Sequence, residues 1–244
     1  MDSGFYAACA GLRAQSQALE VSAHNLANLN TTGFRGQQTT FQALLATAQP
    51  NVSNVLNRAT NNFGVLGGSH VDLTPGNLLA TGNALDLGIE GGGFFAIQTP
   101  QGTRYTRNGN FQIARTGELV TAAGNPVLGE NGPIRVPAGA LSISSDGTLS
   151  VNSAIAGKIR LVEFAPGTKL DSEGEALLNA PSGAALPARQ TSVRPGMLES
   201  SNVNPISAVM SLIGVQREFD MMQRALSLFH TEFNRIASND LPHV

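Results

Sequence analysis

The segment GIEGGGFFAIQT, residues 88–99, is the part of the chain whose glycines most resemble a phosphate-binding loop. A nucleotide-binding loop needs glycines that open a helix, because backbone N–H groups at the helix start then face the phosphate. Here Gly91, Gly92 and Gly93 precede the apolar run at 94–97, which predicts a strand. We therefore expect no phosphate site, but a glycine bend where another backbone comes close to the strand start.

The histidines and the single cysteine form no recognisable catalytic or metal-binding arrangement. His24 and His230 lie in segments that we expect to be helical, and neither has a second ligand four residues later. The motifs HExxH and GxSxG do not occur. Cys9 is the only cysteine, so it has no disulfide partner in the chain, and we expect a small buried apolar residue. The pattern predicts no enzyme, no cofactor and no metal site.

The charge balance also excludes several classes of protein. The formal net charge is −2 and only 13% of the residues are charged, so the basic face of a nucleic-acid-binding protein is missing. No apolar run is long enough to cross a bilayer. Asp2 stands where a secretory signal would carry positive charge, so we expect no cleaved signal. Nothing in the pattern points to a small-molecule substrate.

Residues 3 to about 29 have the seven-residue spacing of a helix that pairs with another helix. The large residues at this spacing are Phe5, Leu12, Leu19 and Leu26. Their partner positions hold Cys9, Ser16 and Ala23, whose small size allows close helix approach. Turn-forming residues and a glycine then end the helix: Asn28, Asn30, Thr31, Thr32 and Gly33. We assign residues 1–33 to the N-terminal helix of an inner domain.

A stronger version of this pattern runs from Pro205 to about Ser238. Asn204 fits the N-cap position, and Pro205 fits the first helical position. All eight a and d positions are apolar: Leu212, Val215, Phe219, Met222, Leu226, Phe229, Phe233 and Ile236. We assign residues 205–244 to the C-terminal helix of the inner domain. The two helices are expected to pair as a coiled-coil-like layer.

The C-terminal helix carries a second apolar stripe besides this seam: Ile206, Met210, Ile213, Met221 and Leu228. The remaining face is formed by Gln216, Arg217, Gln223, Arg224 and Thr231. A helix with two apolar stripes usually has more than one packing partner. The alternative is a long core helix of a globular domain, but two such helices at opposite chain ends favour partners outside the chain.

Between the helices the apolar period changes to two. The segment LSISSDGTLSV places alternating runs on either side of Asp146 and Gly147, which predicts a β-hairpin. Further Gly-containing turns predict a central all-β domain of short strands over residues 85–190. Residues 34–84 are expected to form an extended connector with room for added strands, and residues 191–204 a return connector. The predicted fold class is α+β.

Three segments, in this order, resemble the flagellar rod and hook protein family. NLANLNTTGFRG at 25–36 is similar to the family's N-terminal signature, and the residues that carry it are Asn25, Asn28, Thr32, Gly33 and Phe34. The stretch from LDLGIEGGGFF to NGPIRVP resembles the central β-region. LESSNVNPISAVMSLIGVQREFDM is similar to the C-terminal signature. The chain most resembles the proximal-rod members, with the distal-rod members next.

The resemblance implies a structural subunit of the rod, the drive shaft of the bacterial flagellar basal body, which spans the periplasm. It implies export through the flagellar type III channel and polymerisation through the terminal helices. The partners would be further copies, neighbouring rod proteins and, during secretion, the export apparatus. The polar positions Gln216, Gln223, Arg224 and Thr231 would face the channel, where apolar side chains would hold passing cargo.

Two alternatives remain open at this point. The chain has the pattern of a distal-rod or other axial flagellar protein as well. A secreted β-rich fibre or adhesin-like module, whose ends form an ordinary coiled coil, would give a similar alternation of helical and β-type sequence. Such a module would be a folded oligomer in solution, whereas a rod subunit would be mostly monomeric before assembly.

Overall fold

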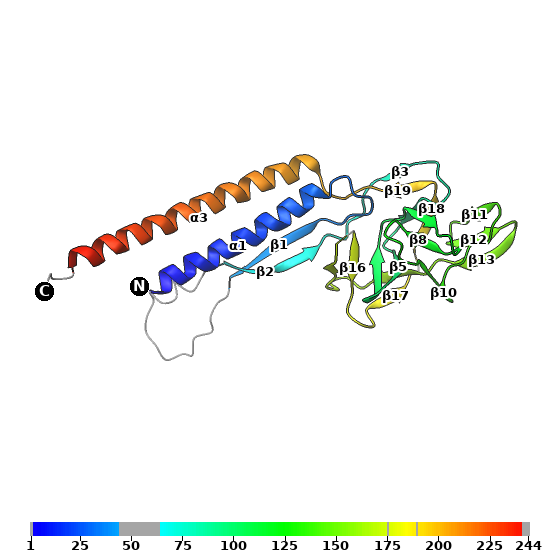
Figure 1. The fold of residues 1–244 in the computed structure, drawn as a ribbon, viewed down its shortest axis with the longest axis horizontal. Coiled ribbons are helices and arrows are strands. Elements are labelled where there is room, and N and C mark those ends of the chain that lie inside the picture. Colours follow the sequence, from blue (N-terminus) through cyan, green and yellow to red (C-terminus); the bar gives the residue numbers. More distant parts are fainter. Residues whose placement is uncertain (1, 44–63, 175, 189, 241–244) are drawn as a thin grey trace. The chain divides into compact units, whose positions relative to one another are not determined.

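A computed structural model describes the backbone of residues 2–43, 64–174, 176–188 and 190–240, and the side chains of 9–40, 68–174, 176–188, 190–228 and 231. The chain divides into two compact units. The first contains both helices and the ribbon formed by β1 and β2. The second comprises Ala27–Gly36 and His70–Asn204 and contains the remaining strands (Figure 1). The fold is thus α+β with many short strands, as predicted.

The first unit is built from two long helices and two strands. Helix α1 covers Asp2–Ala27 and helix α3 covers Pro205–Asp240. The bounds agree to within two residues with the patterned stretches, 3 to about 29 and 205 to about 238, whereas the assigned segment 1–33 also includes the turn after α1. Strands β1 (Gln37–Ala43) and β2 (Gly64–Val71) pair with each other, and the last two residues of β2 belong to the second unit. The segment predicted as a connector therefore adds strands, although its residues 44–63 lie outside the described part.

The second unit is organised around a six-stranded antiparallel sheet. Its strand order is β15 (Asp171–Ser172), β16 (Leu177–Asn179), β6 (Gly102–Thr106), β5 (Phe94–Thr99), β14 (Leu161–Phe164) and β17 (Ala185–Pro187). Strand β5 is central, and its first four residues are buried. Phe94 packs with Val162 and Leu178, whereas Phe95 packs with Ile97 in the larger core cluster. Successive side chains of a strand point to opposite faces, so β5 joins two cores.

Smaller antiparallel pairs complete the unit. Strands β11 (Leu141–Ile143), β12 (Thr148–Val151) and β13 (Ala154–Lys158) form a three-stranded sheet. The pairs are β7 (Phe111–Ile113) with β8 (Leu119–Thr121), and β9 (Leu128–Gly129) with β10 (Gly132–Pro133). The predicted hairpin at Gly147 is confirmed, because Ile143 opposes Leu149 across the turn.

The segment at 191–204, expected to be a return connector, contributes two strands instead. Strand β18 (Ser192–Pro195) pairs with β4 (Leu87–Glu90), and β19 (Met197–Glu199) pairs with β3 (Leu78–Ala80). The glycine bend before β5 lies close to the start of this segment. A Cβ on Gly91 would lie 2.5 Å from the carbonyl oxygen of Gln190 and 3.2 Å from Cα of Thr191. The second unit therefore extends beyond the 85–190 range on both sides, because β3, β18 and β19, which belong to two of its strand pairs, come from the expected connectors.

Candidate functional site

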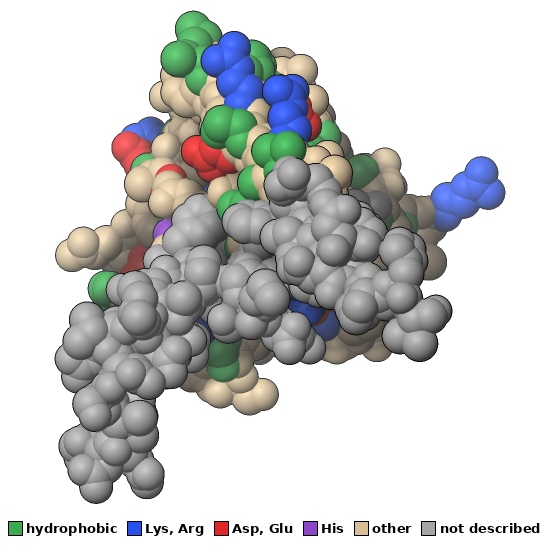
Figure 2. Space-filling model, turned by 90° about the vertical axis from the view of Figure 1, so that its left-hand side faces the viewer, with side chains coloured by type: hydrophobic (Ala, Val, Ile, Leu, Met, Phe, Trp, Pro, Cys, Tyr) green, Lys and Arg blue, Asp and Glu red, His purple; other side chains and the backbone are tan. Residues whose placement is uncertain are grey.

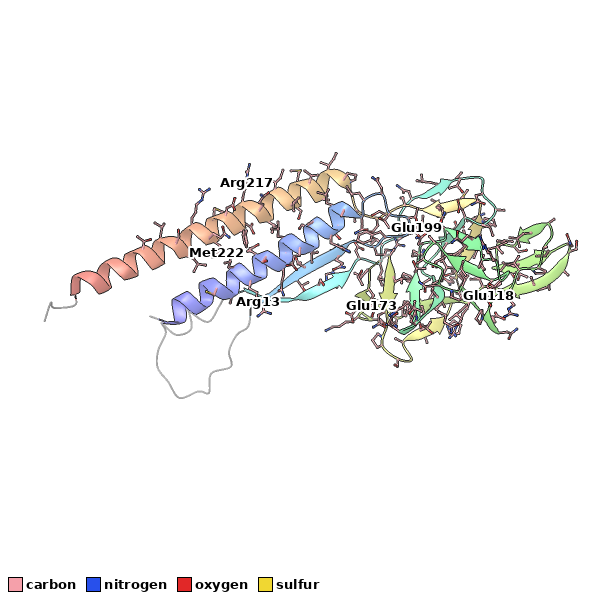
Figure 3. All side chains as sticks on the ribbon, in the orientation of Figure 1. Arg13, Glu118, Glu173, Glu199, Arg217 and Met222 are labelled. Atoms are coloured by element: carbon pink, nitrogen blue, oxygen red, sulfur yellow. The ribbon has the colours of Figure 1, made fainter. Side chains whose placement is uncertain are left out.

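Three buried charged residues of the second unit meet at one point. Arg35 Nη2 lies 2.5 Å from Oε1 of Glu199, and Arg107 Nη1 lies 3.0 Å from its Oε2. The exposed fractions of Arg35, Arg107 and Glu199 are 3%, 1% and 1%. Arg35 follows the turn after α1, and Arg107 follows β6. Glu199, which is labelled in Figure 3, ends β19. Because a buried charge requires a partner, this cluster fixes three distant segments together.

The cluster has further partners around both ion pairs. Glu199 Oε1 also accepts the N–H of Gly76 at 2.7 Å, and Arg107 Nη2 donates to the carbonyl oxygen of Gly91 at 2.6 Å. The guanidinium of Arg107 lies 4.8 Å from the centre of the Phe94 ring. Burial lowers the pKa of Arg107 to about 10, and the nearby Glu199 opposes this shift. Arg107 therefore stays charged at neutral pH and needs its carboxylate partner.

The turn after α1 packs closely against the segment at 107–108. Gly33 has φ of +67°, and a Cβ there would lie 2.2 Å from the backbone nitrogen of Asn108. Its N–H donates to the carbonyl oxygen of Glu199 at 2.7 Å. The hydroxyl of Thr32 donates to Oδ1 of Asn108 at 2.9 Å, and Phe34 is fully buried. Only glycine suits this position, because both the backbone conformation and the close contact exclude a side chain.

Two asparagines close the ends of this turn through side-chain amides. The N–H of Gln37 donates to Oδ1 of Asn25 at 2.8 Å, and Nδ2 of Asn25 donates back to the carbonyl oxygen of Gln37 at 2.7 Å. The side-chain Oδ1 of Asn28 accepts the hydroxyl of Thr31 at 3.0 Å, and the backbone carbonyl oxygen of Asn28 accepts the N–H of Thr31 at 3.2 Å. Each amide thus satisfies backbone or hydroxyl groups that the helix end leaves open. The five predicted signature residues all take part in this local structure.

An asparagine from the C-terminal signature completes the same region. Asn202 Oδ1 accepts the N–H of Gly36 at 2.8 Å, and its Nδ2 donates to the carbonyl oxygens of Asp72 and Thr74 at 3.0 Å each. Asn202 therefore bonds to the segments at both ends of the β1–β2 region in the sequence. From the sequence alone, no role was predicted for Asn202, Arg35, Arg107 or Glu199, although Asn202 lies in the C-terminal signature. The sequence feature that could have identified Glu199 is its charge within an alternating strand pattern.

The predicted a and d positions of α3 form the most buried stripe of that helix's described part, together with Ala208 and Ala225. The half-buried seam residues are Leu212, Val215, Phe219, Met222 and Leu226. Phe229, Phe233 and Ile236 lie in α3, but their side chains are outside the described part. Met222 points toward α1 (Figure 3). A Cβ on Gly11 of α1 would lie 3.2 Å from Cε of Met222, so the seam contacts α1 where the latter has no side chain.

The second apolar stripe of α3 is exposed. We call it the outer stripe, and it consists of Ile206, Val209, Met210, Ile213, Met221 and Leu228. The exposed fractions include 73% for Ile206, 68% for Met210 and 66% for Leu228. Arg217 and Arg224 continue the same stripe at helical spacing, and Arg217 points away from α1 (Figure 3). Hydrophobic and basic side chains share the upper surface in Figure 2.

The buried stripe of α1 differs from the predicted one. Ala14, Ala18 and Ser22 are its most buried described residues, whereas Leu12, Leu19 and Leu26 are only half-buried. The prediction that Cys9 is buried is wrong, because Cys9 is exposed, as is Ala23. Ser16 is half-buried, and Phe5 lies in α1 with its side chain outside the described part. Small residues are indeed used for packing, but they are the ones at 11, 14, 18 and 22.

The channel-facing candidates on α3 are all exposed. Arg224 and Thr231 lie in line with the outer stripe, whereas Gln216 and Gln223 lie on its flank. They therefore do not form a polar face separate from the apolar one. A hydrogen bond from Gln15 Nε2 to Glu218 Oε2 at 3.0 Å joins α1 and α3 on another side.

The described residues hold neither a metal-binding cluster nor a helix that could span a membrane. Histidine, cysteine and carboxylate side chains nowhere gather in threes within the described ranges. Within the described part of the chain, neither long helix has an apolar stretch long enough to span a bilayer. The chemically distinctive features are instead the buried charge cluster and the exposed surfaces of the two helices.

Comparison with known proteins gives three family matches along the chain. The family described as "Flagella basal body rod protein" matches residues 5–35, and "Flagellar hook protein FlgE/F/G D1 domain" matches residues 88–151. "Flagellar basal body rod FlgEFG protein C-terminal" matches residues 194–231. Arg35, Arg107 and Glu199 each fall in a different one of these matches. The buried charge cluster therefore joins the three matched segments.

Curated relatives match over nearly the whole chain. The flagellar basal-body rod protein FlgF of Salmonella typhimurium is 35% identical over 93% of this chain and 94% of its own length. FlgF of Mesorhizobium japonicum is 35% identical over 90% of both chains. FlgG of Bacillus subtilis, also named as a basal-body rod protein, is 34% identical over 91% of this chain and 93% of its own.

Proposed function

The chain belongs to the flagellar basal-body rod protein family, and from this premise we propose how its two units serve assembly of the rod. It is a structural subunit of the rod in the bacterial flagellar basal body. The comparisons confirm the resemblance seen in the sequence, and they replace the secreted fibre or adhesin-like module as an interpretation. Among rod proteins we assign it the role of the FlgF-named relatives, with the FlgG-named ones as the alternative.

The proposal concerns α1 and α3 as the polymerising part of the subunit. The two helices would pair as a coiled-coil-like inner layer around the export channel. Of the four channel-facing candidates, Gln216 and Gln223 would face the channel or the layer that lines it. Arg224 and Thr231 lie in line with the outer stripe and would be covered with it. The chain would reach its place through the flagellar type III export apparatus, and its partners would be further copies and neighbouring rod proteins. No catalytic step and no cofactor enter this role.

The observation that carries the proposal is the outer stripe of α3. Six large apolar side chains on one helix are each at least 42% exposed in the single chain. Fully burying such a side chain is worth about 1.5–3 kcal/mol, so covering the stripe with a partner supplies a substantial driving force. Exposed large apolar side chains gathered along one helix in this way mark an interaction site. In the rod, a neighbouring subunit would cover this stripe.

The test uses substitutions that leave the monomer intact. Ile213→Asp places a carboxylate on the outer stripe, where the side chain is already 46% exposed, so folding of the monomer should be little affected. Ser211→Asp adds the same charge on an exposed position of the same helix outside the stripe. We expect Ile213→Asp to abolish incorporation into isolated basal bodies and swimming, with Ser211→Asp near normal. Normal incorporation of both variants would contradict the proposal.

A further inference from the structure

The dipeptide Asn-Gly occurs twice in the chain, at Asn108–Gly109 and at Asn131–Gly132. Asparagine before glycine is prone to lose its side-chain amide, because glycine has no Cβ to obstruct its own backbone nitrogen and its backbone rotates freely. That nitrogen can then attack the side-chain carbon of the asparagine. Since the two dipeptides are identical, a difference in their reactivity within one molecule comes from their surroundings.

The fold holds the Asn108 side chain away from this reaction. Oδ1 of Asn108 accepts the hydroxyl of Thr32 at 2.9 Å and the N–H of Asn110 at 3.1 Å. The second of these bonds turns the side-chain carbonyl toward the nitrogen two residues later, and not toward that of Gly109. The N–H of Asn108 donates in addition to Oγ1 of Thr106 at 3.0 Å. Side chain and backbone of Asn108 are therefore both fixed.

The backbone of Gly109 is fixed as well. A Cβ on Gly109 would overlap the backbone of Leu87, and the N–H of Leu87 donates to the carbonyl oxygen of Gly109 at 3.0 Å. Leu87 belongs to the larger core cluster and is fully buried. Attack on Asn108 requires the peptide between the two residues to rotate. Close packing against a buried strand opposes that rotation.

The second dipeptide lies in an open turn. Glu130 and Asn131 form the two-residue turn between β9 and β10, in which Gly129 opposes Gly132. Asn131 is exposed, and its side chain forms no hydrogen bond within the described part of the chain. Gly132 has φ of +112°, and nothing lies within 4 Å of a Cβ built there. No hydrogen bond therefore holds the Asn131 side chain away from the nitrogen that attacks it.

We propose that Asn131 is a site of spontaneous deamidation in the folded chain, whereas the fold protects Asn108. The backbone nitrogen of Gly132 forms a bond to Cγ of Asn131 and loses its proton. The Cγ–Nδ2 bond breaks, the departing amide nitrogen takes up a proton, and ammonia leaves behind a cyclic succinimide. Water then opens the ring at either of its carbonyl carbons, which gives aspartate or isoaspartate. Water is the sole co-reactant, and no group is oxidised or reduced.

Both products change the turn between β9 and β10. Each adds a negative charge next to Glu130, whose Oε1 lies 3.6 Å from Nζ of Lys158. Isoaspartate also lengthens the backbone between Gly129 and Gly132, because the chain then runs through the former side chain. The length of a hairpin loop selects its turn type, so the isoaspartate form cannot keep the same turn.

Peptide mapping of the purified full chain by mass spectrometry tests the proposal. The folded protein is kept in mildly alkaline buffer for days, and the deamidated fractions of Asn131 and Asn108 are followed in the same sample. We expect Asn131 to react at least about tenfold faster than Asn108, because reaction requires a near-attack geometry that the Asn108 bonds prevent. Methylation of the Asn131 peptide by an isoaspartyl methyltransferase should identify the isoaspartate product.

Two controls show whether the fold sets this difference. In concentrated urea both asparagines should react at similar rates, since the dipeptides are the same. Thr32→Val removes the hydroxyl that binds Oδ1 of Asn108 and should raise the Asn108 rate in the folded chain, with the Asn131 rate unchanged. Equal rates at Asn131 and Asn108 in the folded chain would overturn the proposal. An Asn131 that reacts only in urea would overturn it too, because pairing of Gly129 with Gly132 would then hold the turn rigid.

Discussion

Arg35 and Glu199 lie 164 positions apart in the chain and form a buried ion pair within the second unit. Arg35 stands two residues before β1, and Glu199 stands six residues before α3. Arg107 shares the same carboxylate, so two buried positive charges depend on one negative charge. The cluster holds together the segments through which the chain enters and leaves the β-rich unit. Its loss should therefore affect the whole unit.

Glu199→Gln should destabilise the second unit by about 3–5 kcal/mol, since it leaves two buried guanidinium groups without a carboxylate. The midpoint of urea unfolding, followed by circular dichroism on the full chain, measures this loss. The matched control is Glu118→Gln, which removes a carboxylate paired with Arg135, whose side chain is 79% exposed. That change should cost less than about 1 kcal/mol. Equal shifts of the urea midpoint for both variants would show that the buried cluster stabilises the unit no more than an exposed ion pair does.

Gly33→Ala should cost more than a glycine substitution at an open left-handed position. Gly33 has φ of +67°, and its Cβ would overlap the backbone of Asn108 at 2.2 Å. Gly124 has φ of +82° with nothing within 4 Å of a Cβ, so Gly124→Ala reports the conformational cost alone, about 1–2 kcal/mol. We expect Gly33→Ala to lower stability further, by roughly 2 kcal/mol or more beyond the control.

Equal unfolding midpoints for these two alanine variants would show that the turn moves away from Asn108 without cost. The hydrogen bond from Gly33 N–H to Glu199 would then also be expendable. Either result is read from the same urea curves as the glutamate variants.

Features set by short stretches of sequence were predictable. The hairpin between β11 and β12 depends on alternation and on the turn at Asp146 and Gly147, which are local. Pro205 marks the start of α3, and a polar turn follows the end of α1. The seam of α3 also follows from spacing alone, because Leu212, Val215 and Phe219 repeat at helical period.

Features set by distant partners were not predictable in this way. Nothing in the local sequence marks Glu199 as buried. Its burial depends on Arg35 and Arg107, which lie 164 and 92 positions away in the chain. The packing side of α1 was missed for a different reason. A search for large apolar residues selects Leu12 and Leu19, whereas the buried side of this helix uses alanine and serine.

A fragment of residues 27–204 should fold without α1 and α3, because it contains all of the second unit. A fragment of residues 37–200 lacks Arg35, the buried Phe34 and the amide of Asn202. We expect both to show strand signal in circular dichroism, with a melting temperature lower by more than about 10 °C for the shorter one, given several kcal/mol of lost contacts. Identical melting curves would contradict a contribution from the turn after α1.

Leu226→Asp should separate folding of the β-rich unit from assembly. Leu226 lies in the seam of α3, half-buried, one heptad after Phe219. Within the single chain the change should cost about 1–2 kcal/mol of local helix packing, since much of the side chain is already solvated. In the assembled rod the added carboxylate would be buried at a seam whose neighbouring described positions, Met222 and Phe219, offer no positive charge. We expect loss of incorporation and of swimming.

The paired measurement is thermal melting of the purified variant and swimming of cells that carry it as their only copy. Ser211→Asp is the matched control, because it adds the same charge at an exposed position of α3 outside both the seam and the outer stripe. The β-rich unit should melt unchanged in both variants, since α3 belongs to the other unit. Normal swimming with Leu226→Asp would mean that the seam is not an assembly contact. Loss of the cooperative melting transition of the β-rich unit would mean that α3 is part of its core. The proposal that α3 serves assembly and the β-rich unit folds without it would then be wrong.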